Sequence, residues 1–532
     1  MPPEQPPQYN YDRRHIVIGL VVLFLIYGTM AYFMQALNIA RPKIAADLDG
    51  MSIYAWSVSI AGLVGAFVTL IFGKLSDIYG RRIMLLISIA FALAGSILSI
   101  LSTTFVFFII ATAIGSVGIG AMMPLVFAVV GDMFPPVERS KWVGMLQLPM
   151  GIAALFGPAL GGYFADTAGW RYFFWSLLPL LILSLILVPF GVPPLAHRGT
   201  KYKIDLWGCL LVIVASSTTI IGISLDGVAY PWTSAPRISL LGIALISWIF
   251  FFRVEYSVEE PILDPLVLRN RCFNTVVVAS SFSFFGQMGM MMYFPMFLQG
   301  VQGISATISG WIFTPYGVLM AFVGVPVGFM LARYRRYKWM YIAGFGILTI
   351  TMFCVLLLSE DTPILFSVIV STLAGLGLGA IPTVNTMVIQ NTVPKRLLGA
   401  AMGASFFCMM MALAVAPAIL GTAERTAYAK ALAASIPDGL DQVVGEKTMA
   451  SRVDSQVLLS KPDMTALENT FKQMGEEGEA LFHQTVDALR TSMLAGLRSV
   501  FWIGAILMLF SFLIIITVPE IPIGSTEENP DS

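Results

Sequence analysis

Long apolar runs recur along this chain, and their length restricts the fold more than any other feature. About 20 apolar residues form a helix that crosses a hydrocarbon core of about 30 Å, and a backbone in lipid must satisfy its own hydrogen bonds. The fourteen candidate spans lie near residues 16–38, 54–73, 83–102, 105–130, 142–164, 173–193, 205–225, 236–255, 273–298, 305–331, 339–358, 364–389, 399–421 and 494–518. Soluble cores do not repeat such runs a dozen times. The sequence therefore predicts an all-α polytopic membrane protein.

The composition agrees with this prediction and excludes several function classes. Hydrophobic residues make up 57% of the chain and charged residues 12%, whereas soluble domains have about 45–50% and about 25%. The net charge is zero, so no basic surface for nucleic acid is visible. The few cysteines and histidines form neither a disulfide framework nor a metal-ligand motif. No nucleotide-binding or hydrolase string occurs, so we expect no enzyme activity, no metal and no cofactor.

The distribution of Lys and Arg in the short loops predicts the orientation in the membrane. With the N-terminus in the cytoplasm, the inner loops and helix ends carry nineteen of these residues. The short outer loops carry four, which are Arg41, Lys43, Arg171 and Arg237. We therefore expect a multi-pass protein of the inner or plasma membrane, with cytoplasmic tails at 1–14 and 521–532.

One predicted connection is long and polar, and it lies between the last two spans on the outer side, at 422–493. Its stretches MTALENTFKQ and EEGEALFHQTVDALRTSML place apolar residues three or four positions apart, which predicts short amphipathic helices. Such a segment is either an external lid or partner site, or a solvated linker with packed helices. We favour the linker.

The loop between spans 2 and 3 reads GKLSDIYGRR, from Gly73 to Arg82. Gly80 permits a tight turn, and Arg81 and Arg82 lie where lipid headgroups are anionic. A generic basic loop explains the arginines, but it does not explain the order G-x-L-x-D-x-x-G-R-R. That order resembles the cytoplasmic signature of the major facilitator superfamily, which lies between helices 2 and 3.

A second motif, GIAALFGPALGG, lies in span 5. Its glycines place small residues on closely spaced turns and its proline weakens the helix ladder, which suits close helix contact and local bending. Packing alone explains any one glycine. The full pattern of Gly151, Gly157, Pro158, Gly161 and Gly162 resembles the superfamily's antiporter signature.

The number of spans narrows the resemblance within the superfamily. Members with twelve helices have two six-helix halves, and here spans 7 and 8 look inserted between the halves. The chain thus resembles the fourteen-helix drug:proton antiporter family. This resemblance implies a six-helix bundle over 15–195, two inserted helices over 196–260 and a second six-helix bundle over 261–520. In that family the two halves rock around a central cavity that opens alternately to each side.

The acid of the first motif, Asp77, has an expected role. The resemblance implies that it holds the two halves together on the cytoplasmic side, by interaction with the positive N-terminal end of a helix. Topology points to span 13, which starts near 395–399, and Arg81 is near enough in sequence to pin the carboxylate. The related turn after span 10 has Ala332 at the matching position. The alternative for Asp77 is a solvated turn acid.

Two charges that this family usually carries are missing. Phe33 replaces the usual aspartate of helix 1, and Thr112 replaces the usual arginine of helix 4. The resemblance associates that pair with proton coupling. A lone buried charge costs about 2.5–3.5 kcal/mol on insertion scales, so the loss of both together is physically coherent. Proton coupling therefore rests on the resemblance and not on these residues.

Amide, methionine and tyrosine side chains of the central spans are candidates for the cavity lining. An embedded amide without a partner is costly, so each either bonds to another helix or faces a wet cavity. Methionine repacks around ligands of differing shape. The candidates are Gln35, Asn38, Gln147, Gln287, Met291, Tyr293 and Asn385. For each, packing in the core or against lipid is the alternative.

These patterns together predict a monomeric secondary transporter in the lipid bilayer. It exports hydrophobic or amphiphilic small molecules by alternating access, with protons as the candidate coupling ion. Two alternatives stay open, a facilitator or importer on the same fold, and a non-transporting receptor or scaffold that uses residues 422–493.

Overall fold

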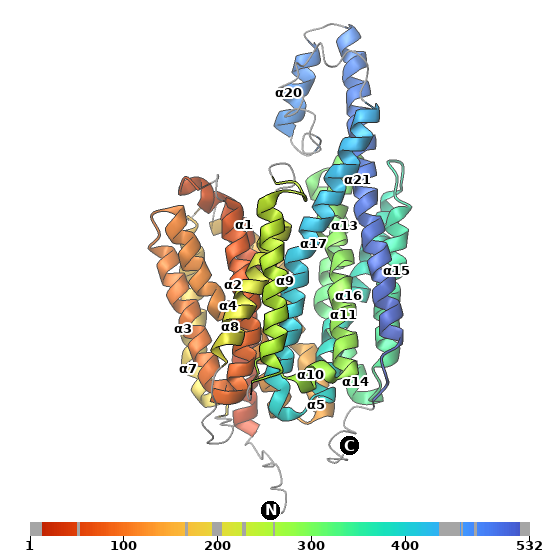
Figure 1. The fold of residues 1–532 in the computed structure, drawn as a ribbon. Coiled ribbons are helices and arrows are strands. Elements are labelled where there is room, and N and C mark those ends of the chain that lie inside the picture. Colours follow the sequence, from red (N-terminus) through yellow and green to blue (C-terminus); the bar gives the residue numbers. More distant parts are fainter. Residues whose placement is uncertain are drawn as a thin grey trace, which may run out of the picture.

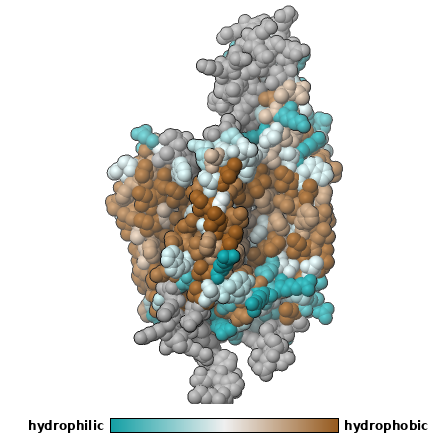
Figure 2. Space-filling view, viewed as in Figure 1, coloured by the Kyte–Doolittle hydropathy of each residue, from teal (hydrophilic) through white to brown (hydrophobic). Residues whose placement is uncertain are grey.

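The computed structural model is almost entirely helical. It describes residues 13–50, 54–164, 167, 169–193, 205–225, 230–258, 261–435, 458, 461–472 and 476–521. Within them, fourteen helical segments are long and apolar enough to cross a membrane, which confirms the fourteen predicted spans. Figure 2 shows apolar side chains as a belt around the middle of the visible face, with hydrophilic residues toward both ends. The chain is a multi-pass membrane protein.

The first bundle holds six of the spans. Its helices are α1 (Arg13–Asp47), α2 (Tyr54–Tyr79), α3 (Arg81–Ile100), α4 (Phe105–Met133), α5 (Pro136–Met145) with α6 (Gln147–Tyr163), and α7 (Arg171–Gly191). Helix α1 packs on α6 and α7, while α4 packs on α2 and α3. Gly80 separates α2 from α3 with a φ of 91°, a backbone conformation that glycine adopts without strain, as the tight turn requires.

The second bundle holds the last six spans. Its helices are α10 (Pro265–Arg269), α11 (Arg271–Met288), η3 (Gly289–Tyr293), α12 (Phe294–Met296), η4 (Phe297–Val301), α13 (Ala306–Phe322), α14 (Gly324–Tyr334), α15 (Lys338–Leu356), α16 (Ile364–Thr392), η5 (Lys395–Leu397), α17 (Leu398–Ser435), α20 (Lys461–Lys472) and α21 (Glu476–Ile516). Helix α21 packs on α11, α15 and α17, and α16 packs on α13 and α15.

Two further spans, α8 (Leu206–Ser224) and α9 (Ala235–Glu255), pack against each other. Helix α8 also contacts α2 of the first bundle and α17 of the second. The inserted pair therefore lies beside the line where the two bundles meet (Figure 1). The lower end of the molecule, as drawn in Figure 1, is the end at which α2 finishes and α17 begins.

Spans 5 and 10 are each broken near their middle, and the breaks face each other. Span 5 divides at Leu146 into α5 and α6, and span 10 divides at Val323 into α13 and α14. A Cβ added to Gly324 would lie 2.7 Å from Cγ of Gln147. Helices without side-chain bulk at a crossing approach closely, so Gly324 allows the two bundles to meet at this level.

The predicted polar connection at 422–493 differs from its expected form. Helix α17 continues past 421 to Ser435, and the second predicted amphipathic helix is the first part of the continuous α21, not a separate short helix. The first amphipathic stretch does form a short helix, α20. Figure 1 shows α17 and α21 rising together beyond the other helices, with α20 beside them. Residues 436–457 lie outside the described part.

Candidate functional site

Asp77, near the end of α2, contacts the first turn of α17. The backbone N–H groups of Gly399 and Ala400 donate hydrogen bonds to Asp77 Oδ1 and Oδ2, at 3.0 Å and 2.7 Å. A carboxylate at a helix N-terminus satisfies backbone N–H groups that have no partner within the helix and interacts favourably with the helix dipole. This helix end lies in the other bundle, where topology had placed the expected partner.

Arg81 pairs with Asp77 and ties three helices together. Its Nη2 lies 2.6 Å from Asp77 Oδ1, and its Nε donates to Asp132 Oδ2 of α4 at 2.8 Å. Ser76 accepts a further hydrogen bond from Nη1. Arg81 is only 1% exposed, so its charge depends on these two carboxylates. Arg82, the other arginine of the motif, is half-buried.

Glycines allow α2 and α17 to touch through their backbones. A Cβ added to Gly73 would lie 2.5 Å from the carbonyl oxygen of Gly399 and 2.8 Å from Cα of Gly403. A side chain at Gly73 would thus collide with backbone, which cannot turn aside. Gly73 and Asp77 of one motif therefore both act at a single contact, which we call the α2–α17 contact.

A second glycine contact joins the bundles between α5 and α14. A Cβ on Gly144 would lie 2.5 Å from the carbonyl oxygen of Gly324, and a Cβ on Gly328 would lie 2.5 Å from that of Ser140. Ala332, which matches Asp77 in position, is buried here and carries no charge. This α5–α14 contact is therefore held by close packing alone at that position, whereas the α2–α17 contact adds charge.

Two polar side chains that sequence reasoning missed also cross between the bundles. Gln390 of α16 donates from Nε2 to the carbonyl oxygen of Phe127 at 2.8 Å, and Arg139 of α5 donates to the carbonyl oxygen of Gln390 at 3.3 Å. Both side chains are buried. No motif marked them, because a backbone acceptor has no sequence signature. With the two glycine contacts, they hold the lower end closed.

A cavity of about 290 Å³ lies between the two bundles. Its lining is Tyr27, Met30, Met34, Met123, Phe127, Gln147, Met150, Val277, Ser280, Ser281, Ser283, Phe284, Gln287, Met320, Ala321, Leu378, Ile381, Pro382, Asn385, Thr386, Met402, Ser405, Phe406, Met409, Met410 and Leu413. Eight of these residues are methionines, and none of the lining residues is charged.

Three of the predicted cavity residues line this space, namely Gln147, Gln287 and Asn385. The other four do not. Gln35 packs on Gly157, whose added Cβ would lie 2.9 Å from Gln35 Cβ, and Asn38 is exposed. In span 9, Met291 is 53% exposed and Tyr293 is buried, and neither lines the cavity. These four residues therefore lie outside this cavity, and their role in substrate binding stays a prediction.

The helix period of span 9 changes after Gln287. Helix α11 ends at Met288, and the chain continues through η3 and η4, two turns of π-helix separated by α12. A π-turn rotates the following side chains relative to a regular helix. Met291 and Tyr293 lie within η3, whereas Gln287 precedes it and lines the cavity.

The amides of the cavity have free hydrogen-bonding capacity. Asn385 Nδ2 donates to Ser280 Oγ at 2.8 Å, which joins α16 to α11, while Asn385 Oδ1 is buried and has no partner among the described residues. Gln287 donates to Ser283 on its own helix at 3.1 Å. A buried acceptor without a partner favours a ligand that brings an N–H or O–H donor.

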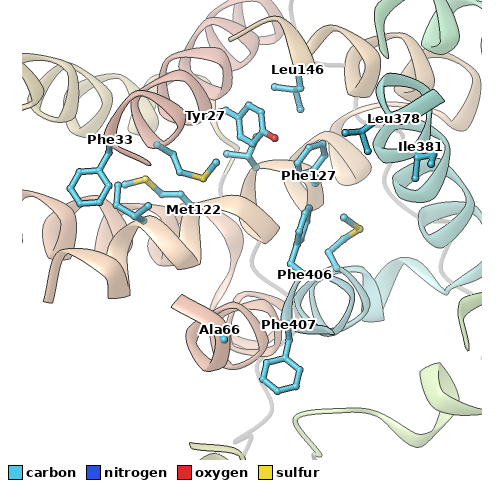
Figure 3. Close-up of a cluster of buried hydrophobic side chains, with 14 of the residues drawn as sticks. Tyr27, Phe33, Ala66, Met122, Phe127, Leu146, Leu378, Ile381, Phe406 and Phe407 are labelled. Carbon is cyan, nitrogen blue, oxygen red and sulfur yellow. The ribbon is translucent and has the colours of Figure 1, made fainter. Parts of the chain in front are cut away.

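Aromatic rings join the two bundles at the cavity wall. The rings of Tyr27 and Phe127 meet edge to face at 5.4 Å, and those of Phe127 and Phe406 lie 5.4 Å apart. Tyr27 and Phe127 belong to α1 and α4, and Phe406 belongs to α17 of the other bundle. Figure 3 shows the three rings side by side in a row, with Phe407 turned to the other side of α17. A ligand in the cavity therefore touches both bundles.

The antiporter-like motif lies in α6, where its glycines permit close contact with α1 and α13. A Cβ on Gly161 would lie 2.4 Å from the carbonyl oxygen of Ala36, and one on Gly151 would lie 2.3 Å from Cβ of Ala321. Gly157 and Gly162 face α1 as well. Pro158 lies within this helix. The motif thus places α6 between the two bundles beside the cavity.

Phe33 and Thr112, the two positions with missing family charges, lie in apolar surroundings. The Phe33 ring packs on Phe173 and Phe174 of α7, at 6.2 Å and 6.5 Å between centroids. Thr112 donates to carbonyl groups of its own helix, at Phe108 and Ile109. Both positions are satisfied without any charge.

Two helical bundles around a central cavity with an uncharged lining are the arrangement of a membrane transporter. The Major Facilitator Superfamily model matches residues 23–417. The chain belongs to this superfamily.

Proteins similar to this chain are named for the transport of different compounds. The Multidrug transporter protein MdtP of Bacillus subtilis (strain 168) is 27% identical over 501 residues, covering 93% of this chain and 91% of the relative. The Riboflavin transporter RibZ of Clostridioides difficile (strain 630) is 28% identical over 408 residues, covering 76% and 86%. The solved proton:xylose symporter XylE has a TM-score of 0.58 at 14% identity, covers 97% of this chain and 99% of its own, and shows the shared fold.

Proposed function

We propose that this transporter exports uncharged apolar or amphiphilic small molecules from the cytoplasm. The observation that carries this proposal is the cavity lining, which combines eight methionines, several rings and a few hydroxyl and amide groups without any charge. A cation in such a cavity would lose its hydration without gaining a carboxylate, at a cost of several kcal/mol. Methionine side chains repack around ligands of different shape, so we infer a broad range of substrates.

The closed lower end supports an alternating-access cycle. Export requires that the α2–α17 and α5–α14 contacts separate so that the cavity opens at the lower end. The distribution of Lys and Arg supports a lower end in the cytoplasm, with both termini on that side of the cell membrane. Proton coupling is part of the proposal, although Phe33 and Thr112 do not supply it.

A second candidate is import of an uncharged amphiphile on the same fold; a relative named as a riboflavin transporter supports an amphiphilic substrate, and its name gives no direction. The direction of net flux separates the two candidates, because both use the same cavity. A receptor or scaffold role is the third alternative, and it predicts no flux.

The test uses purified full-length protein in proteoliposomes of known orientation. We expect flux of an uncharged lipophilic dye, stronger with a pH gradient, and little flux of a monocationic dye of equal size. Protein-free liposomes give the background. Equal flux of the cation would contradict the proposed substrate class, and no flux of any compound by folded protein would favour the receptor or scaffold.

A further inference from the structure

Two buried carboxylates meet at the lower end of the inserted helices, away from the cavity. Asp205 immediately precedes α8 and Glu255 ends α9, and they are 6% and 1% exposed. One oxygen of each accepts a backbone hydrogen bond, Asp205 Oδ1 from Gly208 N at 2.8 Å and Glu255 Oε2 from Leu263 N at 2.9 Å. The first bond caps α8, and the second fixes the connector after α9.

The second oxygen of each carboxylate is buried without a hydrogen-bond partner among the described residues. These two oxygens point to the same place. A Cβ added to Gly208 would lie 2.3 Å from Asp205 Oδ2 and 2.9 Å from Glu255 Oε1. Two carboxylates that share a buried site do not both ionise readily, because the charges repel and neither is hydrated. A proton bound by one of the two carboxyl groups removes this repulsion.

The other charged group beside the pair comes from the first bundle. Lys74 of α2 attracts the Glu255 carboxylate, whereas Asp205 repels it. Cys209 of α8 is the remaining titratable group that the described residues place beside the two acids. Among the described residues, Lys74 supplies one positive charge beside two carboxylates. A further bound proton therefore brings the buried cluster toward neutrality.

We propose that the Glu255 carboxylate, buried beside Asp205, forms a proton-binding site that holds one proton while the lower end is closed. A metal cation fits the site poorly, because hard cations such as Ca²⁺ take six to eight oxygen ligands and this site offers two unbonded oxygens beside an ammonium group.

The site is mechanically connected to the α2–α17 contact. Lys74 and Asp77 lie one helical turn apart on α2, and α8 contacts both α2 and α17. When α2 leaves α17, Lys74 moves and water reaches the two acids, which favours loss of the proton. This link to the transport cycle rests on the proposed function, whereas the proton site itself does not.

The site is tested by infrared spectroscopy on the purified full-length protein, without any transport measurement. The variants Asp205→Asn and Glu255→Gln keep an oxygen for the backbone hydrogen bond, and Asn caps helices as well as Asp does. The control is Asp264→Asn, an acid in the same connector that caps α10 by accepting from Leu266 N at 2.8 Å.

We expect a carboxylic-acid C=O band at neutral pH in the wild type and in the control, and its loss in each of the two variants. The wild-type band should disappear as the pH rises and should not respond to Na⁺. Absence of the band in the wild type, its persistence in both variants, or its replacement by Na⁺ would overturn the proposal.

The link to the cycle has its own readout, the distance between spin labels at the lower ends of α2 and α17. We expect this distance to depend on pH in the wild type and to lose that dependence in Glu255→Gln. An unchanged pH dependence in the variant would refute the link. Failure of export alone would contradict the proposed function and leave the infrared result unaffected.

Discussion

Asp77 Oδ2 lies 2.7 Å from the backbone nitrogen of Ala400, in a hydrogen bond that crosses from the first bundle to the second. The same carboxylate pairs with Arg81, which also holds Asp132. The hydrogen bond to Ala400 exists only while α2 and α17 are together. It therefore stabilises the state with a closed lower end and not the state with an open one.

The substitution Asp77→Asn should shift the balance of the protein toward an open lower end. The amide keeps the shape but removes the charge that faces the start of α17. Interactions of this kind contribute about 0.3–1 kcal/mol at a surface and about 2 kcal/mol when partly buried. We therefore expect a shift of several-fold to about thirtyfold and impaired transport, at nearly normal expression.

Spin labels at the lower ends of α2 and α17 measure this balance. The matched control is Asp361→Asn, an exposed acid in the connection before α16. An unchanged balance and wild-type transport in Asp77→Asn would show that the contact does not govern the cycle.

Gly73→Ala should also open the lower end, for a steric reason. The new methyl group would lie within 2.5 Å of the Gly399 carbonyl oxygen, so the helices must separate or the protein must lose stability. Gly62→Ala on the same helix is the control, because its Cβ would meet nothing within 4 Å. The rate at which a cysteine at Ser405 reacts with a reagent added on the lower side reports the opening. Equal rates in the two alanine variants would contradict the packing argument.

Asn385→Leu should weaken binding of substrates that carry an N–H or O–H donor. The substitution removes the unpartnered Oδ1 acceptor from the cavity, and a hydrogen bond contributes about 0.5–1.5 kcal/mol. The expected loss of affinity is about two- to tenfold, with little change for substrates that lack donors. Titration of purified protein with a matched pair of ligands measures it.

Thr372→Val on the same helix serves as the control for Asn385→Leu, because the Thr372 hydroxyl bonds only to its own helix, at Val368. The ligand with a donor and the ligand without one could lose affinity equally in Asn385→Leu. In that case the amide affects binding through packing and not through a hydrogen bond.

The double variant Phe33→Asp with Thr112→Arg restores both charges that the family usually carries. It should fold better than either single variant. Phe33→Asp alone places a carboxylate among the rings of Phe173 and Phe174, at a cost of a few kcal/mol. Adding Thr112→Arg offers that carboxylate a partner, because α1 and α4 are neighbours. We will compare the folded yields of the wild type, the two single variants and the double variant. We expect them to give a coupling free energy between the two positions of about 0.5–3 kcal/mol. Strict additivity would mean that the two side chains do not meet.

Much of the fold follows from the apolar runs, because a membrane allows few structures other than helices. The start of span 13 as the partner of Asp77 also followed from topology. The rest depended on geometry that the sequence does not contain. The π-turns after Met288 interrupt the regular helix period, and Gln287 lines the cavity whereas Met291 and Tyr293, within η3, do not.

The bonds of Gln390 and Arg139 across the bundles were not predictable either, because their acceptors are carbonyl groups that every residue has. Likewise, hydropathy marks where the last span becomes apolar but not where its helix begins. The amphipathic stretch keeps the helical period of the span that follows, so both form one helix of 41 residues.

Transport through the central cavity is tested most directly by filling the cavity with a large side chain. The measurement is counterflow of an uncharged lipophilic dye in proteoliposomes. Ser405→Trp places an indole in the cavity, and Leu365→Trp places one on α16 at a position that is 70% exposed on the outer surface. We expect counterflow in the wild type and in Leu365→Trp and its loss in Ser405→Trp, with all three proteins folded. Full counterflow in Ser405→Trp would contradict transport through this cavity.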